Sequence, residues 1–100
     1  MKKPRLFEIN IEPGVSADFE TAFSYYDNIS VALSENFKRF ELAIYKLSKE
    51  PYNYFKLTKR LRRITLGKFP YMIVYKTQKN TVTVAGLFHQ ASRRSRWRKL

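Results

Sequence analysis

The chain has 100 residues, of which 44% are hydrophobic and 16% aromatic, enough for one packed core and too few for two. It has no cysteine and one histidine, His89, so disulfides, thiolate metal sites and multi-histidine metal sites are excluded. No apolar run approaches the roughly 18 residues needed to cross a bilayer, and the basic start leads into alternating residues instead of a signal sequence. We therefore expect one cytoplasmic domain over residues 1–100, without metal, cofactor or membrane contact.

The charge of the chain is strongly asymmetric. Lys and Arg number 20 against 8 Asp and Glu, a net charge of +12. Residues 1–50 hold seven bases and all eight acids, whereas residues 51–100 hold thirteen bases and no acid. Self-repulsion of this size favours an anionic partner, which can be nucleic acid, an acidic protein segment or anionic lipid. Charge alone does not choose among the three.

The first half predicts a strand followed by a helix. Residues 6–11 alternate apolar and polar side chains, which is typical of a half-buried strand, and Pro13-Gly14 predicts a turn after it. Ser16 is the expected N-cap of a helix whose apolar stripe begins at Phe19. The pair Asp27-Asn28 is expected to end this helix.

A second helix is predicted more strongly. Leu33, Phe37, Phe40, Ile44 and Leu47 are spaced four, three, four and three residues apart. Ser30 is placed to cap the helix and Pro51 to stop it. Because about two residues separate the helices, we expect an antiparallel helical hairpin.

After Pro51 the apolar pattern changes to a period of two. Residues 61–66 predict a strand, Gly67–Pro70 a turn, and residues 71–75 a central strand that is apolar on both faces. Residues 76–80 turn the chain, and residues 81–89 return it with Val82, Val84 and Phe88 on one face. The first strand is expected to join an edge of this meander. The predicted fold is α+β, with the order βααβββ and a helical hairpin packed on a small antiparallel sheet.

Three groups of residues carry candidate chemistry: the basic run 56–63, Phe88-His89 and the basic tail 92–99. There is no Ser-His-Asp set, phosphate-binding glycine loop or carboxylate pair in the basic half. The reaction that suits such a composition is metal-free RNA cleavage, in which cations stabilise the charge on phosphate and a base moves protons. Its candidate residues are His89, Arg63, Arg93 and Arg94.

Each group also has a plain structural interpretation. A basic run is often a solvated face, and a lone histidine at a strand end is more often a hydrogen-bonded structural residue. Trp97 either covers a sheet edge or stacks on a base. The residues expected to bind a target or nucleic acid are Lys56, Lys59, Arg60, Arg62, Arg96, Trp97 and Arg98.

Four stretches of the sequence form a recognisable pattern in this order. They are Ala17-Asp18-Phe19 with Ala22 and Tyr25-Tyr26, Arg62-Arg63-Ile64-Thr65-Leu66, Phe69-Pro70-Tyr71-Met72-Ile73-Val74-Tyr75, and Phe88-His89-Gln90 with Arg93-Arg94 and Trp97. With these stretches the chain resembles the RelE/ParE superfamily of bacterial toxins over nearly its whole length. The resemblance implies the βααβββ fold and a basic, growth-inhibiting toxin of a type II toxin–antitoxin module, of the kind linked to plasmid stabilisation. It also implies a cognate antitoxin as partner.

The superfamily divides by target. RelE-like members resemble ribosome-dependent mRNA endonucleases, whereas ParE-like members resemble inhibitors of DNA gyrase. Thr65 and Met72 stand where the nucleases often carry bases, and Trp97 stands near a nuclease tyrosine. The ending Phe88-His89-Gln90 is more similar to the ParE-like branch. We therefore expect a gyrase inhibitor, with a ribosome-dependent endonuclease as the alternative and a nucleic-acid-binding module without toxicity as a third hypothesis.

Overall fold

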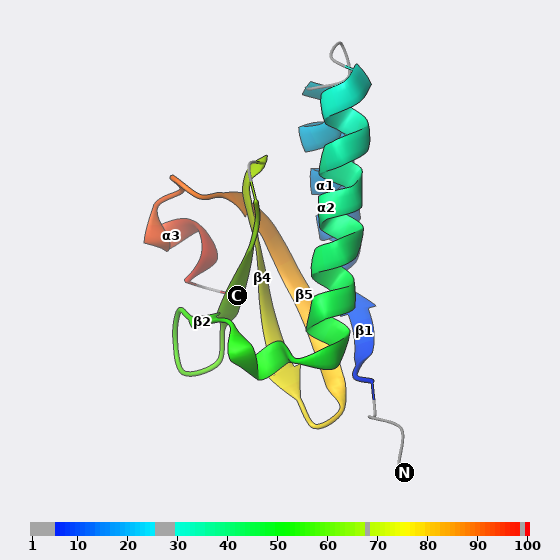
Figure 1. Ribbon diagram of the computed structural model, residues 1–100. Coiled ribbons are helices and arrows are strands. Elements are labelled where there is room, and N and C mark those ends of the chain that lie inside the picture. Colours follow the sequence, from blue (N-terminus) through cyan, green and yellow to red (C-terminus); the bar gives the residue numbers. More distant parts are fainter. Residues whose placement is uncertain (1–5, 26–29, 68, 99) are drawn as a thin grey trace.

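The computed structural model describes residues 6–25, 30–67, 69–98 and 100 (Figure 1). One five-stranded sheet has the order β1-β5-β4-β3-β2. Its strands are β1 (Glu8–Ile11), β2 (Phe55–Lys56), β3 (Arg62–Leu66), β4 (Phe69–Gln78) and β5 (Thr81–His89). The helices α1 (Pro13–Tyr25) and α2 (Ser30–Lys49) cover one face, and the short helix α3 (Arg94–Trp97) lies on the other side (Figure 1).

This architecture confirms the predicted α+β class and the order of the main elements. The meander β3-β4-β5 is antiparallel, as expected, and β1 joins its edge beside β5. β1 runs parallel to β5, so the sheet is mixed and not purely antiparallel. The two-residue strand β2, which pairs with the first two residues of β3, was not predicted.

The start of α1 differs from the prediction. Glu12 donates its N–H to the carbonyl of Val84, and Val15 donates its N–H to the carbonyl of Glu12, so the chain passes from β1 directly into the helix. Pro13 is the first helical residue, a position where its missing N–H and fixed φ are favourable. The predicted turn at Pro13-Gly14 and the predicted cap at Ser16 are therefore wrong.

The second helix follows the prediction within the described residues. It begins at Ser30 and ends at Lys49, just before Pro51. Leu47 is fully buried, Phe40 is half-buried, and the Phe40 ring lies 3.7 Å from the Phe19 ring of α1, centroid to centroid. The predicted helix end at Asp27-Asn28 and the side chains of Leu33 and Phe37 lie outside the described part.

The sheet separates two cores. The helix-side core lies between the helices and the sheet and includes Val15, Leu47, Ile73 and Tyr75. The α3-side core is smaller and consists of Leu61, Met72, Val74 and Trp97, with Leu57 and Phe88 packed at its border. The apolar character of both faces of β4, noted in the sequence, therefore reflects burial on both sides.

A β-bulge corrects the predicted pattern of β5. Tyr75 pairs with Val84, but its neighbour Val74 pairs with Gly86, so Ala85 is an extra residue in the ladder. This extra residue reverses the alternation of the following side chains. Val84 faces the helix-side core, whereas Phe88 packs on the α3-side core instead of sharing a face with Val84.

The turns of the meander are tighter than predicted. β4 already begins at Phe69 and runs to Gln78, which leaves Lys79 and Asn80 as the turn to β5. Gly67, with φ of +66°, takes the left-handed conformation that glycine adopts without strain. In the part of the chain that the structure describes, no helix is long and apolar enough to cross a membrane.

Candidate functional site

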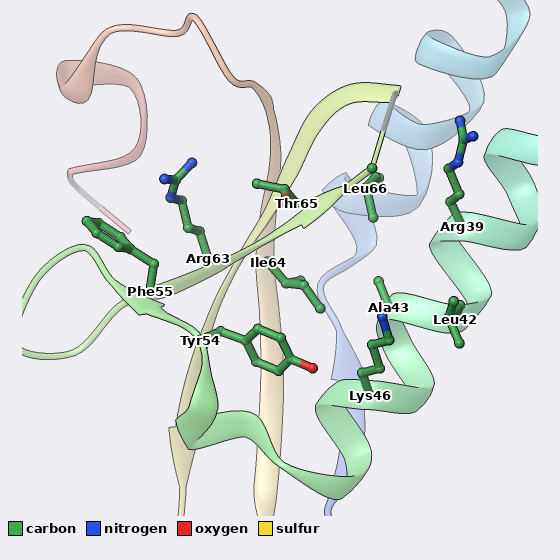
Figure 2. Close-up of a pocket in the computed structure, with 11 residues that line it drawn as sticks. Arg39, Leu42, Ala43, Lys46, Tyr54, Phe55, Arg63, Ile64, Thr65 and Leu66 are labelled. Carbon is green, nitrogen blue, oxygen red and sulfur yellow. The ribbon is translucent and has the colours of Figure 1, made fainter.

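An open groove of about 510 Å³ separates α2 from the outer edge of the sheet (Figure 2). Its wall is apolar where α2 faces β3, and cations lie around it. The apolar residues are Leu42, Ala43, Ile64 and Leu66, and the cations are Arg39, Lys46 and Arg63. In Figure 2 the Tyr54 ring points from the start of β2 into the space between α2 and β3. Burial, with a smaller effect of the Glu50 carboxylate, raises the pKa of Tyr54 above its ordinary value, so its hydroxyl stays a neutral hydrogen-bonding group.

The outer edge of β3 is open beside this groove because β2 is short. β2 pairs only with Arg62 and Arg63, so among the described residues no strand pairs with the outer edge of β3 from Ile64 to Leu66. Such an edge offers backbone hydrogen-bonding groups to an added strand.

Exposed apolar side chains extend the surface around the groove. Leu42 is 51% exposed and Phe55 62%. The Arg63 guanidinium carbon lies 4.7 Å from the centroid of the Phe55 ring, which places a cation against an exposed aromatic face. The sequence patterns did not predict this groove. Leu42, an apolar residue off the predicted stripe of the second helix, was the available signal.

A second hollow, the basic cavity, lies beside the loop between β2 and β3 and the end of β4. It has a volume of about 420 Å³. Its lining residues are Tyr52, Lys56, Thr58, Lys59, Arg60, Arg62, Lys76, Thr77 and Gln78. Five of these nine are cations, and no acidic residue is among them. Four of the cations were predicted as binding residues. Lys76 was not, because only the strand register brings it to this cavity, and the aromatic residue Tyr52 was not predicted either.

Backbone contacts fix the loop that carries two of these cations. The Thr58 hydroxyl accepts hydrogen bonds from the N–H groups of Arg60 and Leu61, at 3.2 and 3.0 Å. The Leu61 carbonyl accepts hydrogen bonds from the N–H groups of Leu57 and Thr58. Because the Leu61 side chain is buried in the α3-side core, the loop is anchored at its base while Lys59 and Arg60 remain exposed.

His89 lies at the end of β5, on the helix side of the sheet. Its Nδ1 accepts a hydrogen bond from the Ala91 N–H at 3.0 Å, and its ring meets the Tyr71 ring edge to face. It shares one hollow with Asp18 and Arg96 and a shallower one with Arg93. The Ala91 contact leaves Nε2 as the nitrogen that would exchange a proton with a substrate.

The four predicted nuclease residues do not form one group. His89 stands opposite Tyr71 and Arg63 opposite Val74 in the ladders of β4. Since Tyr71 and Val74 point to opposite faces of β4, His89 and Arg63 also lie on opposite faces of the sheet. Arg93 lies near His89, whereas the Arg94 side chain is outside the described part.

The predicted binding residues of the C-terminal tail separate in space. Trp97 is only 8% exposed and packs in the α3-side core with Met72 and Val74. In this structure its ring therefore offers little surface to a base. Arg96 shares the His89 hollow, whereas Arg98 lines a shallow hollow with Lys59 and Arg60. No three His, Asp or Glu residues gather at metal-binding distances within the described ranges.

This chain is similar to known proteins in its fold and not in its sequence. No protein-family profile matches the sequence, and no curated protein sequence matches it. The fold, however, is similar to a solved structure described as the chromosomal ParDE toxin–antitoxin system from P. aeruginosa. The similarity has a TM-score of 0.71 at 9% sequence identity and covers 85% of this chain and 97% of that chain.

Proposed function

We propose that this chain is the toxin of a type II toxin–antitoxin module, that it works in the cytoplasm and that it inhibits DNA gyrase in the manner of ParE. The observation that carries the proposal is the fold similarity to a chain of the ParDE system, which spans nearly the whole of both chains. The acid-free half of the sequence supports it, because an antitoxin with an acidic segment would neutralise that charge.

The open groove between α2 and β3, the α2–β3 groove, is the proposed binding site of the cognate antitoxin. Its apolar wall at Leu42 and Leu66 suits apolar side chains of a bound segment, and its cations at Arg39 and Lys46 suit acidic ones. The unpaired edge of β3 adds backbone groups for an extended segment. An amphipathic acidic segment therefore satisfies all three features of the groove.

The gyrase target is favoured over mRNA cleavage by the arrangement of the candidate catalytic residues. His89 and Arg63 lie on opposite faces of the sheet, so they do not converge on one phosphate. Met72 and Trp97, at positions that the nucleases use for chemistry, are buried. Arg93 and Arg96 do lie near His89, but Arg63, the predicted nuclease cation of β3, cannot contact the same phosphate as His89.

The test is induction of the chain in bacteria without an antitoxin, with parallel pulse labels for DNA and protein synthesis. We expect growth to stop and DNA synthesis to fall first while mRNA remains intact. A chain with Ile73→Asp in the buried centre of β4 is the control for the burden of expression. Early loss of translation with cleaved mRNA would transfer the proposal to the endonuclease, and unchanged growth would overturn the toxin function.

A further inference from the structure

We propose that the basic cavity beside the β2–β3 loop binds the phosphate backbone of a nucleic-acid strand. This is a second site, separate from the α2–β3 groove, and it does not depend on which target the toxin has. Its cations come from four parts of the chain: Lys56 from β2, Lys59 and Arg60 from the loop, Arg62 from β3 and Lys76 from β4. Five cations around one hollow provide for several successive phosphates.

The contrast between the two hollows identifies the ligand class. The α2–β3 groove has aliphatic side chains in its wall, whereas no aliphatic or Phe side chain lines the basic cavity among the described residues. An antitoxin segment gains much of its affinity from apolar burial, which this cavity does not offer. A phosphate backbone needs cations and hydrogen-bond donors, and these are the groups that are present.

The Arg62 side chain and the backbone of the β2–β3 loop are held in place before a ligand arrives. Arg62 donates from Nη1 to the Tyr54 carbonyl at 2.9 Å, and its guanidinium carbon lies 5.6 Å from the centroid of the Tyr52 ring. One of its five N–H donors is used in this bond. Thr58 fixes the loop that presents Lys59 and Arg60. Side chains that are already oriented lose less conformational entropy on binding.

Tyr52 gives the site a chemical feature beyond charge. Its side chain is 55% exposed and lies at the cavity beside Arg62. Exposed aromatic rings interleaved with cations are typical of sites for single strands, where bases stack on the rings and phosphates contact the cations. We therefore expect single strands to bind more tightly than a duplex of the same sequence.

The experiment measures fluorescence anisotropy of labelled probes with the full chain at several salt concentrations. The probes are a 20-nucleotide DNA strand, the RNA of the same sequence, the DNA duplex and a 20-residue glutamate-rich peptide. The site variant is Lys59→Gln/Arg60→Gln. The matched control is Lys38→Gln/Lys49→Gln, which removes the same charge from exposed positions on α2.

We expect the site variant to bind the DNA strand about tenfold more weakly, and we expect its slope of log K against log salt to become shallower by about 1.4, which is about 0.7 for each charge removed. The control pair should change affinity by less than about twofold. Tyr52→Ala should weaken the single strand more than the duplex, which a purely electrostatic surface would not show. Circular dichroism on each variant establishes that the fold is retained.

Three results would overturn the proposal. Equal losses in the site and control variants would mean that the net charge attracts nucleic acid without a site. Tighter binding of the glutamate-rich peptide than of any strand, lost in the site variant, would assign the cavity to a protein partner. Absence of binding by the unmodified chain would exclude the site outright. Since none of these readouts uses toxicity, they are independent of the proposed gyrase inhibition.

Discussion

Tyr75 shows how a single buried hydroxyl ties α2 to the sheet. The ring is fully buried in β4, and the hydroxyl donates a hydrogen bond to the carbonyl of Pro51, the first residue of the short 3-10 helix Pro51–Asn53 that follows α2. Burial raises the pKa of this hydroxyl well above the ordinary value of 10.0, against a smaller lowering effect of Arg62. The folded protein therefore favours the neutral tyrosine.

Tyr75→Phe should lower the free energy of unfolding by about 1–2 kcal/mol at pH 7, because the Pro51 carbonyl loses its donor. The unmodified chain should also lose stability as the pH rises above about 10, where the unfolded tyrosine ionises and the folded one does not. Urea unfolding at pH 7 and pH 10.5 measures both effects. Tyr45→Phe, at an exposed position on α2, is the control and should change neither value.

Thr77 carries a hydroxyl that the fold does not use. Its Oγ1 is buried and has no hydrogen-bond partner among the described residues. Thr77→Val keeps the shape and the β-branched side chain while removing this group, so the free energy of unfolding should rise by about 1 kcal/mol. Urea unfolding of the two chains measures the change. A fall of similar size would show that the hydroxyl has a partner that stabilises the fold.

At the scale of elements, the β2–β3 loop depends on Thr58. Thr58→Ala removes the acceptor of two backbone N–H groups without changing the charge. We expect a stability loss of about 1 kcal/mol and about threefold weaker binding of the DNA strand, since Lys59 and Arg60 lose their fixed presentation. Ser48→Ala, which deletes a hydroxyl that bonds within α2, should leave strand binding unchanged. Equal binding by all three chains would show that loop geometry has no part in the site.

The elements that the sequence predicts well are those whose pattern is local. The second helix, the central strand and the meander depend on spacing within one segment, and they form as expected. The parallel pairing of β1, the bulge at Ala85 and the short β2 depend on contacts between distant segments. The same limit applies to the basic cavity. The run from Lys56 to Arg62 is visible in the sequence, whereas the position of Lys76 beside this run depends on the register of β3 with β4.

At the scale of the whole molecule, the C-terminal tail has two roles that a deletion would confuse. Removing residues 93–100 takes away several cations, but it also removes Trp97 and exposes Met72 and Val74 of the α3-side core. Loss of toxicity after such a deletion would therefore not identify a target-binding tail. Arg96→Gln/Arg98→Gln changes charge at exposed positions and leaves this core intact.

We expect Arg96→Gln/Arg98→Gln to reduce growth inhibition at equal expression, because an anionic target would be attracted less strongly. The dose of inducer that halves the growth rate measures the effect. Lys38→Gln/Lys49→Gln is again the control with the same change in net charge. An unchanged dose for the tail variant would remove Arg96 and Arg98 from the target-binding surface.

The groove shares no lining residue with the basic cavity and does not include the tail cations Arg96 and Arg98, so neutralisation can be tested separately from toxicity. Leu42→Glu places a carboxylate in the groove at a position that is half exposed, so the fold should tolerate it. It should repel an acidic segment and remove apolar contact area. We therefore expect a chain that still inhibits growth but is no longer rescued when its cognate antitoxin is co-expressed.

Tyr45→Glu is the matched control for this last experiment. It makes the same change in charge at an equally exposed position of α2, but Tyr45 does not line the groove. Rescue by the co-expressed protein should persist in this variant. Rescue of both variants would place the antitoxin elsewhere on the molecule, whereas loss of rescue in both would mean that the charge of α2 as a whole, and not the groove, attracts the antitoxin. Only loss confined to Leu42→Glu supports a segment seated between α2 and the open edge of β3.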